Sequence, residues 1–197
     1  MYKDIFKWTA AVVTQPAKAW KMMVSKEASE AKAQGEGNKD DPFLTEYLYP
    51  FIGILTVAAF LSIFTHKEFV LEQALKSAII TCVSSFGGYY VAAYVLNELG
   101  KSFWGFEKNM KRWQHFVGYS SALMFVLDMV WMLLPDVFFL YIFVFYTFYI
   151  VWEGAEVYLS VGEKFRMKFT IAATVLIILT PMAIDKLLIL LMPGLRY

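Results

Sequence analysis

The sequence predicts an all-α membrane protein, a bundle of five transmembrane helices preceded by an amphipathic helix at the membrane surface. The first observation is composition: 59% of the 197 residues are hydrophobic and the mean hydropathy is +0.52, whereas soluble domains average roughly 45–50% apolar residues. The second is the presence of five stretches of about 20 mostly apolar residues, the length needed to cross about 30 Å of hydrocarbon. The third is the concentration of basic residues between these stretches.

Residues 1–33 have the pattern of an amphipathic helix. Lysines flank an apolar stripe with helical steps of three and four, namely Phe6, Ala10, Val13, Ala17, Trp20 and Val24. Such a helix, with a basic flank and Trp anchors, is typical of a segment that lies in the headgroup plane. We expect its interfacial anchors to be Phe6, Trp8, Val13 and Trp20. Packing against the protein's own cytosolic loops is the alternative.

Two breaks are expected near this helix. Pro16 lacks a backbone N–H and should kink the helix or restart it. Residues 34–46 contain "QGEGNKDDP", and this mixture of glycine, charge and proline predicts a flexible linker.

Five spans follow the linker, and a short tail, 194–197, closes the chain outside the membrane. The predicted spans are 47–65, 74–99, 115–135, 137–160 and 169–193. Only Asp136 separates the third span from the fourth after Pro135, so these two should form a tight antiparallel hairpin.

The basic residues predict the orientation. Seven lysines precede the first span, four basic residues lie in 100–114 and three in 161–168, which makes 14 of the 18 on one side. Short loops rich in Lys and Arg stay in the cytoplasm. The N-terminus should therefore be cytosolic and the C-terminus outside.

One face of the second span consists of small residues that recur at helical steps: Ser77, Thr81, Ser84, Ser85, Gly88 and Ala92. Small side chains let helix backbones approach closely, which favours association within lipid. We expect this face to pack against another helix, a protein partner or a second copy of the chain.

Charged residues form two groups within the spans. The outer group is Asp128, Asp185 and Lys186, and the inner group is Glu98, Glu153 and Glu156. Asp128 lies thirteen residues past His115, about 20 Å along a helix, and a charge at that depth needs a partner such as Lys186 or Thr180. Cation binding or proton relay is one interpretation. Structural pairing is favoured because no charged residue is expected between the two groups.

The sequence predicts no catalytic residue, cofactor or metal site. Its two histidines, His66 and His115, fall on opposite sides of the membrane, and no HExxH, GxSxG, P-loop or GxGxxG motif occurs. Cys82 is the single cysteine, which excludes a disulfide framework and a CxxC pair. A net charge of +1 offers no electrostatic argument for nucleic-acid binding.

The order of these features resembles the Yip-domain family of five-span membrane proteins over most of residues 4–193. The segments that carry the resemblance are "TQPAKAW", "YLYPF", "HFVGYSSALMFVLDMVWMLLP" and "YTFYIVWEGAEVYLSVGEKFRMK". Its markers are Gly118-Tyr119-Ser120, Pro135, Tyr149 through Gly154, and the basic turn after Gly162. Leu123 stands where a Pro is usual, and Tyr47-Leu48-Tyr49-Pro50 replaces the Asp-Leu-Tyr-Gly-Pro signature of Golgi members.

The resemblance implies a non-enzymatic helix bundle. Eukaryotic relatives act in Golgi and endoplasmic-reticulum trafficking and contact Rab-type GTPases, while this compact chain is more similar to bacterial members of the inner membrane. The leading hypothesis is a scaffold or adaptor that binds the bilayer and a protein partner or its own copies. The alternative is a small transporter or ion-permeation subunit that uses the buried acids.

Overall fold

All regular elements are helices in the part of the chain that the computed structural model describes, residues 2–33, 41–65 and 70–192. The all-α polytopic fold is therefore confirmed. The predicted tail 194–197, and 34–40 of the predicted linker, lie outside the described residues.

The N-terminal segment forms two helices. α1 (Tyr2–Thr14) ends before Gln15, and α2 (Pro16–Ala33) begins at the proline. Proline suits the first position of a helix because the N–H that it lacks has no partner there in any case. The expected restart at Pro16 is thus confirmed.

The first two long helices lie side by side. A short π-helix, η1 (Leu44–Leu48), leads into α3 (Tyr49–Ser62) and the 3-10 turn η2 (Ile63–Thr65). α4 (Leu71–Trp104) has 34 residues, a length of about 50 Å. Since the hydrocarbon core is only about 30 Å thick, α4 must tilt strongly or project beyond it.

The third predicted span is a broken helix. α5 (Met110–Ser120) and α6 (Ala122–Leu133) meet at an angle of 41°. The 3-10 helix η3 (Pro135–Tyr146) then packs back on α6 and continues into α7 (Thr147–Val157), as the hairpin prediction required. The last helix is α8 (Glu163–Leu191). The described residues thus contain four helices able to cross a membrane, or five if α5 and α6 together make one span.

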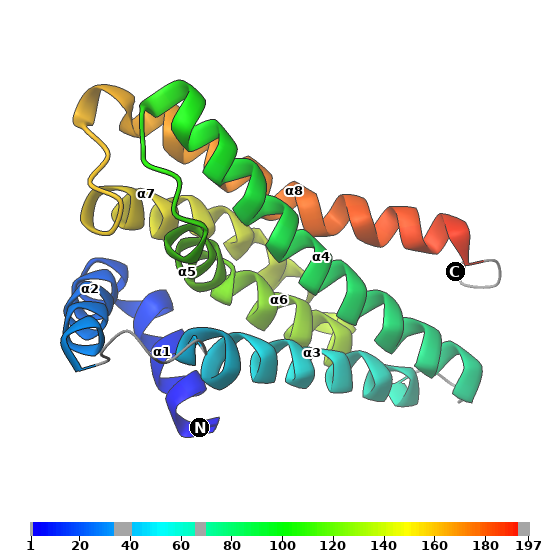
Figure 1. The fold of residues 1–197 in the computed structure, drawn as a ribbon. Coiled ribbons are helices and arrows are strands. Elements are labelled where there is room, and N and C mark those ends of the chain that lie inside the picture. The colour runs from blue at the N-terminus through cyan, green and yellow to red at the C-terminus, as the bar shows by residue number, and fades with distance from the viewer. Residues whose placement is uncertain (1, 34–40, 66–69, 193–197) are drawn as a thin grey trace.

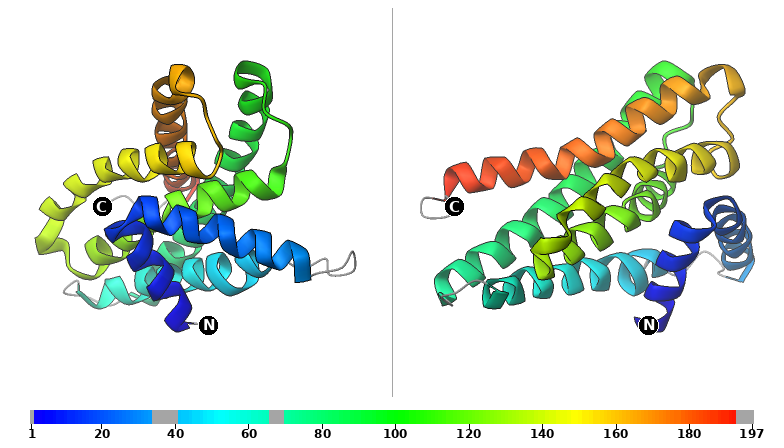
Figure 2. Two further views of the ribbon diagram at one scale, coloured as in Figure 1. Left: turned by 90° about the vertical axis from the view of Figure 1, so that its left-hand side faces the viewer. Right: turned by 180° about the vertical axis from the view of Figure 1, so that it is seen from behind.

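The basic segments gather at one end of the bundle, which we call the basic end. α1 and α2 lie there, together with the connection between α4 and α5 and the one between α7 and α8 (Figures 1 and 2). The far ends of α3 and α8 lie at the opposite end. This arrangement is the one that the charge distribution of a membrane protein with cytosolic basic loops requires.

The second half of the predicted linker is part of the folded protein. Phe43 is buried, with its ring centroid 4.7 Å from that of Tyr119 and 4.5 Å from that of His115. The side chain of Asp41 is only 12% exposed. The charge and proline that suggested flexibility here instead belong to a segment that is anchored by one aromatic ring and one carboxylate.

The backbones of α4 and α8 touch at one point. A Cβ added to Gly88 would lie 2.6 Å from Cα of Pro181 and 2.8 Å from its nitrogen. Only glycine leaves room for this approach, so Gly88 has the packing role expected of the small-residue face.

We expect Gly88→Ala to destabilise the bundle, because the new methyl group meets backbone that cannot move aside cheaply. Overpacking of this kind costs about 1–3 kcal/mol. Gly53→Ala is the matched control, since a Cβ at this membrane-helix glycine meets nothing within 4 Å. Thermal melting in one detergent should show a lower midpoint for Gly88→Ala alone, and equal melting of the two variants would contradict the close contact.

Candidate functional site

The side chain of Trp20 joins the N-terminal helices to the membrane bundle. It is 0% exposed, and its indole Nε1–H donates a hydrogen bond to the backbone carbonyl of Ile150 in α7 at 3.0 Å. Its ring stacks on Phe116 at a centroid distance of 5.6 Å. Gly154 provides the space, because a Cβ there would lie 2.6 Å from the indole.

This burial differs from the expectation for the predicted interfacial anchors. Trp20 lies inside the protein rather than at a membrane surface, and Trp8 and Val13 are half-buried against the bundle core. Phe6 is 60% exposed. The N-terminal helices therefore pack against the same chain, as the alternative interpretation held, but on the helices α5 and α7 rather than on cytosolic loops.

The buried stripe is shifted by one residue from the predicted one at most positions. The buried side chains on α1 and α2 are Ile5, Thr9, Val12, Pro16, Ala19, Trp20 and Met23. Apolar residues stand at both of two adjacent helical phases, for example Ile5 beside Phe6 and Val12 beside Val13. Periodicity alone could not choose between these phases.

A buried histidine lies at the centre of the second contact between the N-terminal segment and the bundle. His115 Nδ1 bonds to Glu27, and its Nε2 bonds to Oδ2 of Asp41 at 2.8 Å. The hydroxyl of Tyr158 donates to the same Glu27 oxygen at 2.7 Å. We call Glu27, Asp41, His115 and Tyr158 the clasp.

The geometry of the clasp defines its charge state. Both ring nitrogens of His115 face carboxylate acceptors, and a histidine donates from both nitrogens only as the imidazolium. Burial alone would raise the pKa of Asp41, but the His115 hydrogen bond and charge, with Lys111 at 3.8 Å, hold it below the usual range. Burial and the adjacent Glu27 raise the pKa of Tyr158, so its phenol stays protonated and can donate.

The inner acids of the sequence prediction do not form a cluster of carboxylates. Glu98 pairs with Lys108 at 2.5 Å, and Glu156 pairs with Arg166 at 2.5 Å, while Glu153 is half-buried on α7. Surface pairs of this kind contribute little to stability. The first joins α4 to the connection that follows it, and the second joins α7 to α8.

The outer acids line a cavity of about 420 Å³, whose lining also includes Tyr89. Asp128, Asp185 and Lys186 all border it, so the structure brings the predicted outer group together. Asp128 accepts a hydrogen bond from the hydroxyl of Tyr141 at 3.2 Å. No ion pair joins Asp128 to Lys186 among the described residues, and the expected salt bridge is replaced by this tyrosine contact.

Most of the predicted packing face lines the same cavity. The members of the face that border it are Thr81, Ser84, Ser85, Gly88 and Ala92, and all five are buried. Ser77 is half-buried and lies outside it. The face therefore points into the chain's own bundle rather than towards a partner.

Sequence reasoning missed the clasp. Its hydrogen bonds join residues 88, 74 and 131 positions apart, and no local motif marks them. The available signal was the rarity of histidine, because His115 is the single histidine on the predicted cytosolic side of a chain that has only two.

The Yip1-domain family model matches residues 10–184 of this chain. The chain belongs to the Yip1-domain family. The matched range takes in α2, the clasp and the membrane helices up to residue 184 of α8. Most of α1 lies before it, and Asp185 and Lys186 of the cavity lie just after it. No curated relative and no solved structure matches the chain at a significant level.

We expect His115→Ala to destabilise the protein, because it leaves the partly buried Asp41 and Glu27 carboxylates without their cation. Removing one partner of a buried charge pair costs about 3–5 kcal/mol, and the exposure of Glu27 places this site at the lower end. A double-mutant cycle with Asp41→Ala, followed by thermal melting, measures the coupling directly. Additive effects of the two substitutions would contradict the clasp.

The clasp also predicts that the protein loses stability at acidic pH. The pKa of Asp41 is lower in the folded protein than its ordinary value of 3.8, so its contribution is fully present above about pH 4 and is lost as the pH falls through the lower, folded value. Melting of wild type and Asp41→Asn from pH 7 to pH 3 checks this. The melting midpoint of the wild type should fall more steeply below pH 4 than that of Asp41→Asn. Parallel curves would show that folding does not lower the pKa of Asp41.

Proposed function

We propose that this Yip1-domain protein is a non-enzymatic membrane scaffold or adaptor that binds its partner through the outward surface of α1 and α2. The observation that carries the proposal is the docking of these helices by Trp20 and the clasp. A helix pair held in one place presents a preformed surface, which reduces the entropy lost when a partner binds.

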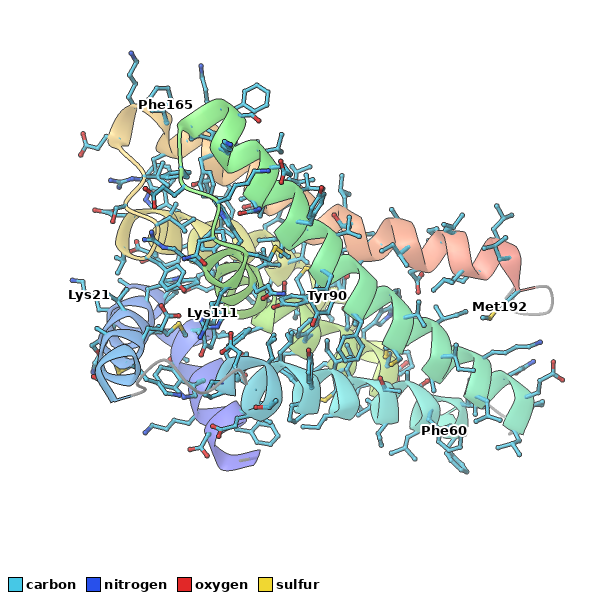
Figure 3. The ribbon with its side chains drawn as sticks, viewed as in Figure 1. Lys21, Phe60, Tyr90, Lys111, Phe165 and Met192 are labelled. Atoms are coloured by element: carbon cyan, nitrogen blue, oxygen red, sulfur yellow. The ribbon has the colours of Figure 1, made fainter. Side chains whose placement is uncertain are left out.

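The outward surface of α1 and α2 has a mixed chemistry suited to a protein partner. Its exposed basic residues include Lys7, Lys18 and Lys21, and its exposed apolar residues include Phe6 and Met22. Figure 3 shows Lys21 pointing away from the bundle. Basic groups around exposed apolar side chains favour a partner with an acidic rim and an apolar centre.

The basic end supports a cytosolic N-terminus and an outward C-terminus, and we propose the bacterial inner membrane as the location. The inward-facing small residues of α4 do not favour association through that helix. We therefore place the partner contact at α1 and α2, whether the partner is another protein or a second copy of the chain.

Site-specific photocrosslinking in cells tests this proposal. A photoreactive amino acid at Lys21 should give a discrete protein adduct, and Lys7→Glu with Lys18→Glu should weaken it because the charge complementarity is lost. The same amino acid at Leu190, which is exposed at the opposite end, is the control and should give lipid adducts. Lipid adducts alone at Lys21 would show that the helices face the leaflet and would contradict the adaptor.

The cavity favours a transporter or permeation subunit as the second candidate, because charged side chains inside a membrane bundle often mark a substrate path. Proteoliposomes with an imposed cation or proton gradient distinguish the two functions. A flux that Asp128→Asn abolishes would support transport, whereas the adaptor predicts that wild-type and empty vesicles leak at the same rate.

A further inference from the structure

The cavity between α3, α4, α6, η3 and α8 combines an apolar wall with a charged end. Leu55, Met124, Phe125 and Ile177 contribute to the wall. Asp128, Asp185 and Lys186 border the charged end. A concave site with an apolar lining and a few polar groups is the usual form of a small-molecule site.

Polar groups in the cavity lack partners in the described structure. Tyr89 lines the cavity and is only 3% exposed, and its buried hydroxyl has no hydrogen bond to a described residue. The half-buried Asp185 has no hydrogen bond or ion pair to a described residue, and Tyr141 supplies the hydrogen bond to Asp128. A buried polar group without a partner is costly, so these atoms point to a ligand.

The charged side chains of the cavity indicate the charge that the ligand should carry. Two carboxylates and one ammonium leave one negative charge unbalanced, and Lys186 is exposed at the rim. In a medium of low dielectric constant a cation next to Asp128 would offset that charge. Trp131 and Tyr141, with ring centroids 5.5 Å apart, border the same end and offer aromatic faces that attract cations.

The rim defines the route of entry. Trp131, Phe138 and Met182 border the cavity and are 52%, 68% and 42% exposed. These apolar rim residues belong to segments that are long and apolar enough to cross a membrane, α6 in combination with α5, so we expect the opening to face lipid. A ligand that enters there must be soluble in the bilayer.

We propose that this cavity binds the ammonium group of a membrane amphiphile, with the cation against Asp128 and Asp185 and the apolar part along Met124, Phe125 and Ile177. The ammonium group is the shared chemistry of two sources, a free long-chain amine and the headgroup of an aminophospholipid. This site is separate from the proposed partner surface, so either proposal can fail alone.

Titration of the full-length protein in a neutral maltoside detergent, followed by native mass spectrometry, tests the proposal. The probes are dodecylammonium, dodecanol and dodecanoate, which share a chain and differ in head charge. Dodecylammonium should bind at least tenfold more tightly than either other probe. Equal binding of all three would show an apolar cavity without charge selection, and preference for dodecanoate would show that Lys186 dominates; both overturn the proposal.

Two carboxylate variants and a control locate the cation. Asp128→Asn and Asp185→Asn should each weaken dodecylammonium binding about tenfold and leave dodecanol unchanged. If the buried Asp128 variant fails to fold, the half-buried Asp185 variant still decides. Asp136→Asn removes an exposed carboxylate that lies outside the cavity, in the adjacent η3, and should bind like wild type. An equal loss in Asp136→Asn would mean that surface charge, not the cavity, attracts the amine.

Competition identifies the source of the ammonium group. Dioleoylphosphatidylethanolamine that displaces dodecylammonium, while the matching phosphatidylglycerol does not, would support an aminophospholipid headgroup. Displacement by neither lipid, with tight amine binding, would support a free amine. Equal displacement by both would show that acyl chains alone compete, and it would overturn the headgroup contact.

Discussion

The insertion of Trp20 beside Gly154 is the contact on which the basic end of this protein depends. The indole fills the space that glycine leaves on α7 and donates to a carbonyl of that same helix. A buried indole needs a partner for its N–H, and the Ile150 carbonyl supplies it. Because α2 is fixed at this point, Glu27 lies about two helical turns further along it, within reach of His115 and Tyr158.

The two ends of the bundle differ in how tightly they are packed. At the basic end, aromatic rings from α2, α5 and α8 form a continuous group around Phe116, which contacts Trp20, Trp113 and Phe169. Beyond the contact between Gly88 and Pro181, the end of α8 carries leucines such as Leu187 and Leu190 that are exposed in the isolated chain. The cavity borders this more open half. A rigid end for partner contact and an open end for a membrane ligand are therefore compatible within one small bundle.

The sequence predicted the features that depend on local chemistry. Apolar length predicted membrane helices, Pro16 predicted a helix restart, and the single residue between Pro135 and the next apolar run predicted the hairpin. In each case the physical cause acts within a few residues of its effect. The Yip-domain resemblance, carried by short motifs in order, is confirmed by the family match over residues 10–184.

The clasp and the cavity depend on tertiary placement instead. His115 meets carboxylates from two distant segments, and nothing within one helical turn of any of them indicates the others. Asp128 accepts a hydrogen bond from Tyr141 of η3 instead of pairing with the expected lysine, because the chain turns at Pro135 and η3 packs back on α6. The small residues of α4 were predicted to be a packing face. Gly88 does meet the backbone of α8 at Pro181, but five of the six residues also line the cavity. The position of the neighbouring helix decides whether a small side chain borders that helix or a cavity.

Hydrogen–deuterium exchange across α2 tests most directly the central claim that the N-terminal helices are part of the folded domain. In wild-type protein in nanodiscs, the backbone amides of residues 17–29 should exchange slowly, and Trp20→Ala should accelerate them while α3 stays protected. Lipid contact is separated from docking by repeating the measurement in a neutral detergent without anionic lipid, where protection should persist. Rapid exchange of α2 in the wild type, or equal protection with and without the indole, would contradict the account.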